Sequence, residues 1–426
     1  MKIKKNIKNI ITMYYVKEMI FVSPCRRTLT KLIIYISCFV LVFFIFSIIQ
    51  ISRQFYESMN AQKVRYPTDL KYILFWKKPI TNRSEKLRFN HAPKFIDGQS
   101  MFIKQRCKFI NCFITHNKYL LRKDHQNLDA VVFDVRDIMD FSINEFDLTR
   151  SADQKYIFRS LHSSENYPIC DPFFDNFFNW TWTYKLNSDI PQPLINIYNS
   201  RNELVGPNIN MAWNKKMIHK NRFFRQISSK TKAVAWIVNK CKMKRKYQDF
   251  VRELKKELKS YNYTLDIYGT CGDNMCPGSS ITKCLKMIEM RYFFQLIVED
   301  TFAEDYVSER MVRAMTRIVI PIVLGTSDYN NFLPPGSYIN AQTFDMKKLG
   351  AIIDYLLQNR NTYKHFFDWK NHYYYTVRPR SLVCDLCEKL NNFNQTYKST
   401  IRKDFRKWWN SDYKNACQKR FHKIYV

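Results

Sequence analysis

The fold is decided by the stretch Val298-Glu299-Asp300-Thr301-Phe302-Ala303-Glu304-Asp305-Tyr306-Val307-Ser308-Glu309-Arg310. An apolar run over 293–298 leads into five acidic residues that lie within eleven positions. A helix-like segment over 311–316 follows, and then a second apolar run over 318–324, which Gly325 closes. Strand, polar loop, helix and strand is the order of a parallel α/β unit, whose ligands bind beyond the carboxyl ends of the strands. We therefore expect an α/β fold with this loop at a ligand crevice.

Other apolar runs extend the same alternation over the 426 residues, a length sufficient for two globular domains. Short runs bounded by charge are typical of buried parallel strands. We expect strands at 71–76, 129–134, 156–161, 232–238 and 265–269, and a basic helix over 242–258. Proline and glycine residues between 191 and 220 indicate a linker. The predicted divisions are a cytoplasmic tail (1–31), an anchor (32–52), a stem (53–70), an N-terminal α/β domain (71–205), a C-terminal α/β domain (206–375) and a basic tail (376–426).

The N-terminal region predicts a single transmembrane helix. Residues 32–52 contain no charged side chain, and at about 1.5 Å per residue they span roughly the 30 Å core of a bilayer. Eight basic residues and one acidic residue precede this run. By the positive-inside rule the N-terminus stays cytoplasmic and the remainder is translocated. A cleaved signal peptide would need a shorter apolar run with small residues after it, so we expect a type II anchor.

Ten of the twelve cysteines lie beyond the anchor, where an oxidising compartment favours disulfides. Cys384 and Cys387 could form a metal half-site, a redox pair or a short structural loop. No second such pair and no suitably spaced histidines follow, so we expect structural disulfide bonding and not a zinc site. Cys107 and Cys112 could bond to each other or to the C-terminal cysteines. The same side of the anchor carries four glycosylation sequons, at Asn82, Asn179, Asn262 and Asn394.

The formal net charge of +32 favours an anionic partner. Nucleic acid is not expected, because the basic residues are spread along the whole chain and no nucleic-acid-binding module is recognisable. Anionic lipid or the pyrophosphate of a nucleotide sugar fits the charge equally well.

The opening stretch resembles the donor-binding signature of the α-1,3-fucosyltransferases, glycosyltransferase family 10. Further similarity lies in the blocks 178–190, 233–241, 267–272, 320–325 and 334–344, and the resemblance spans roughly 72–375. It implies a GT-B enzyme, in which an acceptor-side and a GDP-fucose-binding Rossmann-like domain face a cleft. It also implies a Golgi membrane enzyme that moves L-fucose with inversion to N-acetylglucosamine of an N-glycan or a glycolipid.

In the predicted donor site, basic residues are expected to take the role that a metal has in many glycosyltransferases. Many glycosyltransferases hold a divalent metal in an Asp-x-Asp loop, and this chain has no such triplet. A divalent metal stays open as an alternative, but no cofactor is expected to be required. Arg310 is the main candidate to bind the diphosphate, since a guanidinium holds phosphate oxygens in a bidentate fork. Lys244 and Arg245, near the start of the basic helix, are alternatives for a second cation.

Residue by residue, the resemblance assigns further roles. The family's Glu-Asn-Ser begins here as Glu299 and Asp300, and its Thr-Glu-Lys stands as Ser308, Glu309 and Arg310. Glu309 would contact the fucose or its developing charge. Tyr306 and Asp300 would contact the nucleotide, together with Glu299 at the head of the signature.

The base that deprotonates the acceptor has two candidates. Family members carry a Glu-Ser-Pro triplet before the 178–190 block, and its glutamate aligns here with His162. A histidine titrates near neutrality and could act as the base. Glu165, three residues later, is the other candidate. If neither serves, the chain would be a catalytically silent relative that binds a GDP-sugar or a glycan and partners an active transferase.

Overall fold

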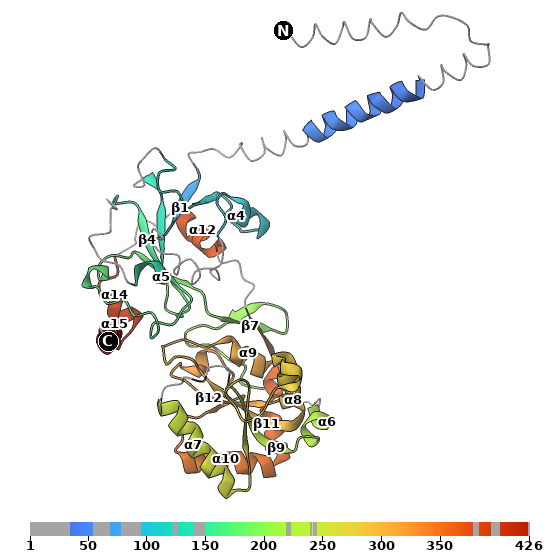
Figure 1. Ribbon diagram of the computed structural model, residues 1–426, viewed down its shortest axis with the longest axis vertical. Helices are drawn as coiled ribbons and strands as arrows, with labels where there is room; N and C mark the ends of the chain where they lie inside the picture. The colour runs from blue at the N-terminus through green and yellow to red at the C-terminus, as the bar shows by residue number, and fades with distance from the viewer. Residues whose placement is uncertain are drawn as a thin grey trace, which may run out of the picture. The chain divides into compact units, whose positions relative to one another are not determined.

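The computed structural model describes residues 35–53, 69–77, 95–121, 127–139, 150–218, 223–238, 241, 245–377, 383–392 and 401–424. The chain divides into two compact units, 1–70 and 71–426. In the first unit the helix Tyr35–Arg53, blue in Figure 1, has 19 residues and is apolar and exposed almost throughout. Its length and composition suit a membrane span, and it overlaps most of the predicted anchor. Residues 32–34, the tail and most of the predicted stem lie outside the described residues.

The first half of the large unit is built on a parallel sheet, in the order β2-β1-β3-β4-β5-β6. Its strands are β1 (Lys71–Trp76), β2 (Cys112–Thr115), β3 (Ala130–Asp134), β4 (Lys155–Ser160), β5 (Trp180–Thr183) and β6 (Ile190–Pro191). Every neighbouring pair is parallel, so the carboxyl ends of all six strands lie along one edge. The strands predicted at 71–76, 129–134 and 156–161 are confirmed. Two short helices, α4 (Ser100–Lys104) and α5 (Val135–Ile138), belong to this half.

The second half contains another parallel sheet, in the order β10-β9-β11-β12-β13. Its strands are β9 (Lys232–Ile237), β10 (Leu265–Tyr268), β11 (Tyr292–Val298), β12 (Ile320–Leu324) and β13 (Ile339–Asn340). All seven residues of β11 are buried, as expected for a central strand that is covered on both faces. The predicted strand–loop–helix–strand unit around the opening stretch is therefore confirmed.

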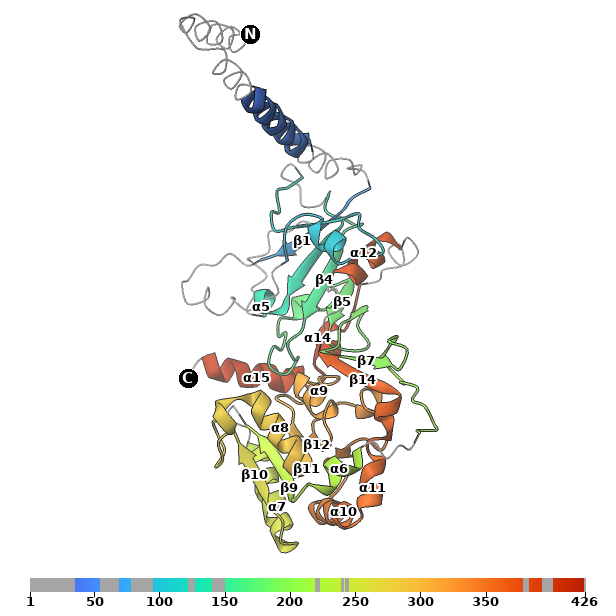
Figure 2. The same ribbon diagram turned by 90° about the vertical axis from the view of Figure 1, so that its right-hand side faces the viewer.

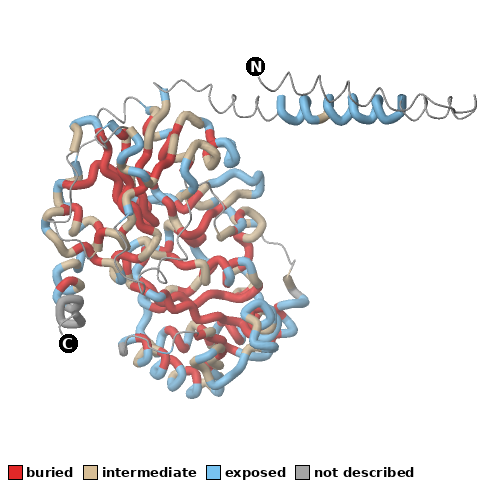
Figure 3. Tube along the Cα trace, turned by 45° about the horizontal axis from the view of Figure 1, so that its top comes forward, coloured by how far each residue is buried: buried red, intermediate tan, exposed pale blue. Residues whose placement is uncertain are grey.

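Helices cover both faces of this second sheet. They are α6 (Phe224–Ser228), α7 (Arg245–Ser260), α8 (Ile281–Arg291), α9 (Glu309–Met315), α10 (Met346–Gln358) and α11 (Arg360–His365). Helix α7 is amphipathic and packs beside α10 (Figure 1), where Leu254 and Leu258 are fully buried. Successive residues of β9 point to opposite faces, because Val234 packs with the α7 side while Ala235 packs with α8. The tube in Figure 3 shows buried segments, in red, in the interior of each half, with exposed segments, in pale blue, around them.

The first part of the stretch predicted as a linker, residues 195–206, is folded into a third sheet. Strands β7 (Ile195–Asn199) and β8 (Leu204–Gly206) pair antiparallel, and β14 (Tyr373–Val377) pairs antiparallel with β7. Ile195 and Ile197 are fully buried. The sequence did not predict a strand here, because the residues around them are polar and include prolines. Residues 207–218, which follow β8, contain no helix or strand, and residues 219–222 lie outside the described residues.

The C-terminal tail returns to the first half of the unit, as Figure 2 shows for the red helices. Its helices are α12 (Cys384–Asn391), α14 (Phe405–Trp409) and α15 (Tyr413–Ile424). Disulfides fix it there: Cys107 and Cys112 bond to C-terminal cysteines, one of the two predicted alternatives, and the predicted structural disulfide bonding involves Cys384 and Cys387. Both residues lie on α12, which packs against β1, and each bonds to a cysteine far away in the sequence. The bonds are Cys107–Cys384, Cys112–Cys387, Cys170–Cys417, Cys241–Cys271 and Cys276–Cys284.

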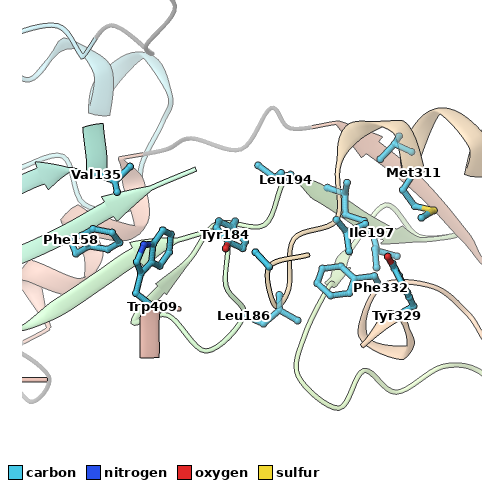
Figure 4. Close-up of a cluster of buried hydrophobic side chains, with 14 of the residues drawn as sticks. Val135, Phe158, Tyr184, Leu186, Leu194, Ile197, Met311, Tyr329, Phe332 and Trp409 are labelled. Carbon is cyan, nitrogen blue, oxygen red and sulfur yellow. The ribbon is translucent and has the colours of Figure 1, made fainter. Parts of the chain in front are cut away.

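A single core cluster joins the two halves of the large unit. Figure 4 shows Phe158 and Trp409 of this cluster on one side, Phe332 on the other, and Tyr184 and Leu186 between them. The rings of Phe158 and Trp409 meet edge to face, with their centroids 4.8 Å apart. Because one buried cluster spans both sheets, the residues that follow β11 face residues of the first half across a packed junction.

Candidate functional site

The loop between β11 and α9 holds its acidic residues in several different environments. Glu299 is buried, with 1% of its surface exposed. Asp300 pairs with Arg310 in the same loop. Glu304 and Asp305 instead reach the first half of the unit, where they bind Lys185 and the backbone of Leu186. The predicted acidic cluster therefore separates into a core residue, an ion-pair partner and two residues that connect the halves.

Arg310 lies at the carboxyl end of β11, in the second position of α9. One guanidinium nitrogen donates to both carboxylate oxygens of Asp300, at 2.6 Å each, and another donates to the carbonyl of Val298 at 2.9 Å. The side chains of Arg310 and Asp300 are 40% and 31% exposed. The guanidinium is thus positioned by the strand that precedes it, and an anionic ligand can reach it from solvent.

Glu299 lies below this ion pair in a buried polar group. Its Oε1 accepts a hydrogen bond from the backbone N–H of Ser308 at 3.1 Å. Burial raises the pKa of Glu299 to about 7. A Cβ at Gly325 would lie 2.1 Å from the hydroxyl of Tyr329, so glycine is required for the close packing beside Glu299. The expected contact between Glu299 and the nucleotide does not fit this burial. The residue instead ties the end of β11 to the start of α9.

We expect the buried Glu299 to make stability fall as pH rises. The folded-state pKa of about 7 exceeds the ordinary value of 4.5, so between these values the folded state binds more protons than the unfolded state. Glu299→Gln should therefore match the wild type in thermal stability near pH 5. Near pH 8 it should be more stable by up to about 3 kcal/mol, at roughly 1.4 kcal/mol per pKa unit. Melting curves of the full chain in detergent at both pH values test this, and a difference independent of pH would contradict it.

Contacts across the junction position the middle of the loop. The ammonium of Lys185, whose side chain is 3% exposed, bonds to Glu304 at 2.7 Å. Asp305 has φ of +59° and accepts from the N–H of Leu186 at 3.0 Å. Tyr306 packs its ring edge-on against Tyr184, with the centroids 5.1 Å apart. Burial raises the pKa of Tyr306 to about 12, so its hydroxyl stays protonated and can donate to a ligand oxygen.

A cleft of about 760 Å³ opens beside this loop. It is lined by residues from the first half, from the loop and α7, and from the C-terminal segment; Glu165, Lys246, Phe302, Glu304 and Asp412 are among them. Glu165 reaches across the junction, because its Oε2 accepts from the backbone N–H of Phe302 at 2.7 Å. One of the two candidate bases is therefore in the cleft and in contact with the predicted donor loop.

His162, the other candidate base, lies beside a buried ion-pair group. Burial and the cation Arg136 lower its pKa, only partly offset by Asp134, so the imidazole is neutral at physiological pH. Asp134 bonds to Arg159 at 2.6 Å and to Arg136 at 2.8 Å. Burial alone would raise the pKa of Asp134, but the two guanidiniums outweigh it and lower this pKa. His162 is not among the residues that line the cleft, and its ring packs on Tyr167 at 4.7 Å.

The start of α7 supplies a cation that the sequence did not single out. Lys244 lies outside the described residues, and of Arg245 only the backbone, as the first residue of α7, is described. Lys246 lines the cleft, and its ammonium lies 3.9 Å from the centre of the Phe302 ring. The ring of Tyr247 stacks on the same Phe302 at 4.7 Å. The basic residues at the start of α7 indicated the region, and Lys246 is the one that the described residues place at the cleft.

The remaining predicted sites have different outcomes. Glu309, at the start of α9, is 45% exposed and lies 3.8 Å from Arg313. The described residues contain no group of three or more His, Cys, Asp or Glu side chains arranged to hold a metal ion. Asn262 is exposed, and Asn82 and Asn394 lie outside the described residues. Asn179 is 8% exposed, and its side-chain oxygen accepts from the backbone of Tyr156. This burial disfavours the predicted glycan at Asn179.

Family models match both halves of the large unit. The fucosyltransferase N-terminal model matches residues 68–194. The model of glycosyltransferase family 10 (fucosyltransferase), C-terminal part, matches residues 227–408. Together the two matches cover well over half of the chain. The chain belongs to glycosyltransferase family 10. This family-10 chain is accordingly a glycosyltransferase of the fucosyltransferase type.

Named relatives agree with this assignment. The α-(1,3)-fucosyltransferase C of Drosophila melanogaster is 27% identical over 361 residues, which cover 83% of this chain and 81% of the relative. A 4-galactosyl-N-acetylglucosaminide 3-α-L-fucosyltransferase of Gorilla gorilla gorilla is 29% identical over 290 residues, or 66% and 68% of the two chains. A crystal structure of an α1,3-fucosyltransferase with GDP-fucose has 14% identity and a TM-score of 0.42, covering 80% of this chain and 94% of that one.

Proposed function

We propose that this family-10 protein transfers L-fucose from GDP-fucose to N-acetylglucosamine of glycoprotein or glycolipid glycans, with inversion. The names of its relatives support the fucosyl donor and an α-1,3 linkage. The observation that carries the proposal is the exposed face of Arg310 at the carboxyl end of β11, where parallel sheets bind their ligands. A diphosphate is the ligand that a guanidinium in this position fits best.

In the proposed reaction an acceptor hydroxyl attacks the anomeric carbon while the bond from that carbon to the diphosphate oxygen breaks. Negative charge develops on the departing GDP, and a positive group already in place stabilises it. Arg310 supplies that charge and exchanges its bonds to Asp300 for bonds to the phosphate oxygens. Lys246 is the second cation, since its ammonium lies at the cleft. Glu309 is proposed to face the sugar.

We assign the role of base to Glu165. It lines the cleft and bonds to the backbone of Phe302 in the donor loop, whereas His162 is outside the cleft lining. A carboxylate that lines the cleft can accept the proton of the acceptor hydroxyl. His162, neutral because of its lowered pKa, is the alternative.

The proposed location is the Golgi membrane, with the helix Tyr35–Arg53 as a type II anchor and the large unit in the lumen. Five disulfides in the large unit suit an oxidising lumen. The excess of basic residues before the helix gives the orientation.

The test is transfer of labelled fucose from GDP-fucose by the full chain in detergent, with N-acetyllactosamine and N,N′-diacetylchitobiose as acceptors. We expect labelled trisaccharide from at least one acceptor, both with added divalent metal and with a chelator present. Calorimetric binding of GDP without any transfer would favour the catalytically silent relative. Absence of GDP binding would contradict both functions.

A further inference from the structure

The C-terminal segment, residues 405–417, forms one wall of the cleft. Residues Trp409 to Asp412 and Ala416 line it, opposite Phe302 and Lys246 of the second half. The match to the family's C-terminal model ends at residue 408, so most of this wall lies beyond it. The family match therefore does not explain the residues from 409 onward that line the cleft.

This segment is held against the first half by buried contacts. Trp409 has no exposed surface, and its indole N–H donates to the carbonyl of Tyr167 at 2.8 Å. The side-chain amide of Asn410 donates to the carbonyl of Ser164 at 3.2 Å. A disulfide joins Cys417 to Cys170. The wall is thus fixed on both sides of the residues that line the cleft.

The same contacts hold the loop that carries the proposed base. The three attachment points, Ser164, Tyr167 and Cys170, are in the loop that contains Glu165. Glu165 and the C-terminal segment therefore form one structural piece, and a ligand on the wall lies next to the proposed base.

The chemistry of the wall favours a neutral saccharide over the nucleotide. Carboxylates of Glu165, Glu304 and Asp412 line this part of the cleft, and they disfavour a diphosphate. Carboxylate and hydroxyl groups bond well to sugar hydroxyls. Lys246 lines the cleft and Arg310 is not among its lining residues; both cations come from the second half, where the diphosphate is proposed to bind.

The side chain of Asp412 is held in place by neighbouring residues and has an oxygen that can bind such a ligand. Its Oδ1 accepts from the side-chain amide of Asn415 at 2.6 Å, and its backbone N–H donates to Asn410 at 3.0 Å. Within the described part of the chain its Oδ2 has no hydrogen-bond partner. The neighbouring Ser411 is exposed and lines the cleft.

We propose that Ser411 and Asp412 form a saccharide subsite for the acceptor glycan, built by the C-terminal segment and placed beside Glu165. This inference rests on the proposed function, because it takes the cleft to be the place where donor and acceptor meet. It makes the C-terminal segment a determinant of acceptor choice, separate from the donor loop.

The test measures disaccharide and GDP binding separately, on the full chain in detergent. The probes are N-acetyllactosamine and N,N′-diacetylchitobiose, followed by saturation-transfer NMR, and GDP, followed by calorimetry. Ser411→Trp fills the cleft without removing a hydrogen bond from the fold, and we expect it to weaken disaccharide binding at least about tenfold. Asp412→Ala should weaken it about threefold to tenfold, the loss expected for one ordinary hydrogen bond at an exposed position.

Lys414→Trp is the matched control, because Lys414 is exposed on the same segment and does not line the cleft. It should bind both disaccharides like the wild type, and all three variants should keep the GDP affinity of the wild type. Unchanged disaccharide binding in Ser411→Trp and Asp412→Ala would overturn the subsite, as would a wild type that binds neither disaccharide. A wild type that fails to bind GDP contradicts the proposed function instead, while the disaccharide measurements still decide the subsite.

Discussion

Arg310→Ala is expected to lower kcat/KM for GDP-fucose about 100-fold to 1000-fold. Removing one preorganised charge from a site where anionic charge develops costs on the order of 3–4 kcal/mol in the transition state. The geometry supports a loss of this size, because the strand carbonyl of Val298 already holds the guanidinium in place. Initial rates at varied GDP-fucose, with acceptor saturating, measure the effect.

Arg252→Ala is the control for this loss, since Arg252 is a 73% exposed arginine on α7 that pairs with Asp249 away from the cleft lining. Its kcat/KM should stay within about twofold of the wild type, because exposed ion pairs contribute little. If Arg310→Ala retains more than about a tenth of the activity, another cation stabilises the leaving GDP. Lys246 would then be the first residue to test.

Asp300 tests the same idea from the opposite direction. The carboxylate of Asp300 accepts hydrogen bonds from the Arg310 guanidinium, to which the diphosphate is proposed to bind. Asp300 therefore competes with GDP-fucose for Arg310. Asp300→Asn removes this competing charge and keeps the shape of the side chain. We expect GDP to bind about threefold to tenfold more tightly to the variant, a range suited to a partly exposed ion pair. Weaker binding would mean that Asp300 helps to hold the nucleotide.

The sequence was a good guide to the two parallel sheets. A buried parallel strand needs a nearly continuous apolar run, and such runs are visible at 71–76, 232–238 and 293–298. The position of Arg310 also followed, since it depends only on the order strand, loop, helix. These features depend on neighbouring residues in the chain, so local patterns predict them.

Features that depend on distant contacts could not be predicted. Glu299 is an acidic residue after a strand, so the sequence suggested that it binds a ligand. The packing of Tyr329 against Gly325 instead makes it a core residue. Cys384 and Cys387 are close in sequence, yet the sheet places Cys107 and Cys112 against their helix. The position of the C-terminal segment beside Glu165 also depends on long-range packing, which the pattern of apolar residues along the chain does not predict.

Replacement of the proposed base, Glu165, is expected to cause the second large loss of activity, in kcat. Glu165→Gln is expected to lower kcat about 100-fold to 10,000-fold, because general-base catalysis contributes about that much. The acceptor KM and the GDP affinity should change little, because glutamine keeps an oxygen for the N–H of Phe302.

His162→Ala is the matched comparison, and we expect a loss in kcat below about tenfold, since His162 is outside the cleft lining. The opposite order of losses would make His162 the base. In that case the acidic limb of the pH–kcat profile should fall below the ordinary histidine pKa of 6.5, because burial and Arg136 lower the pKa of this imidazole.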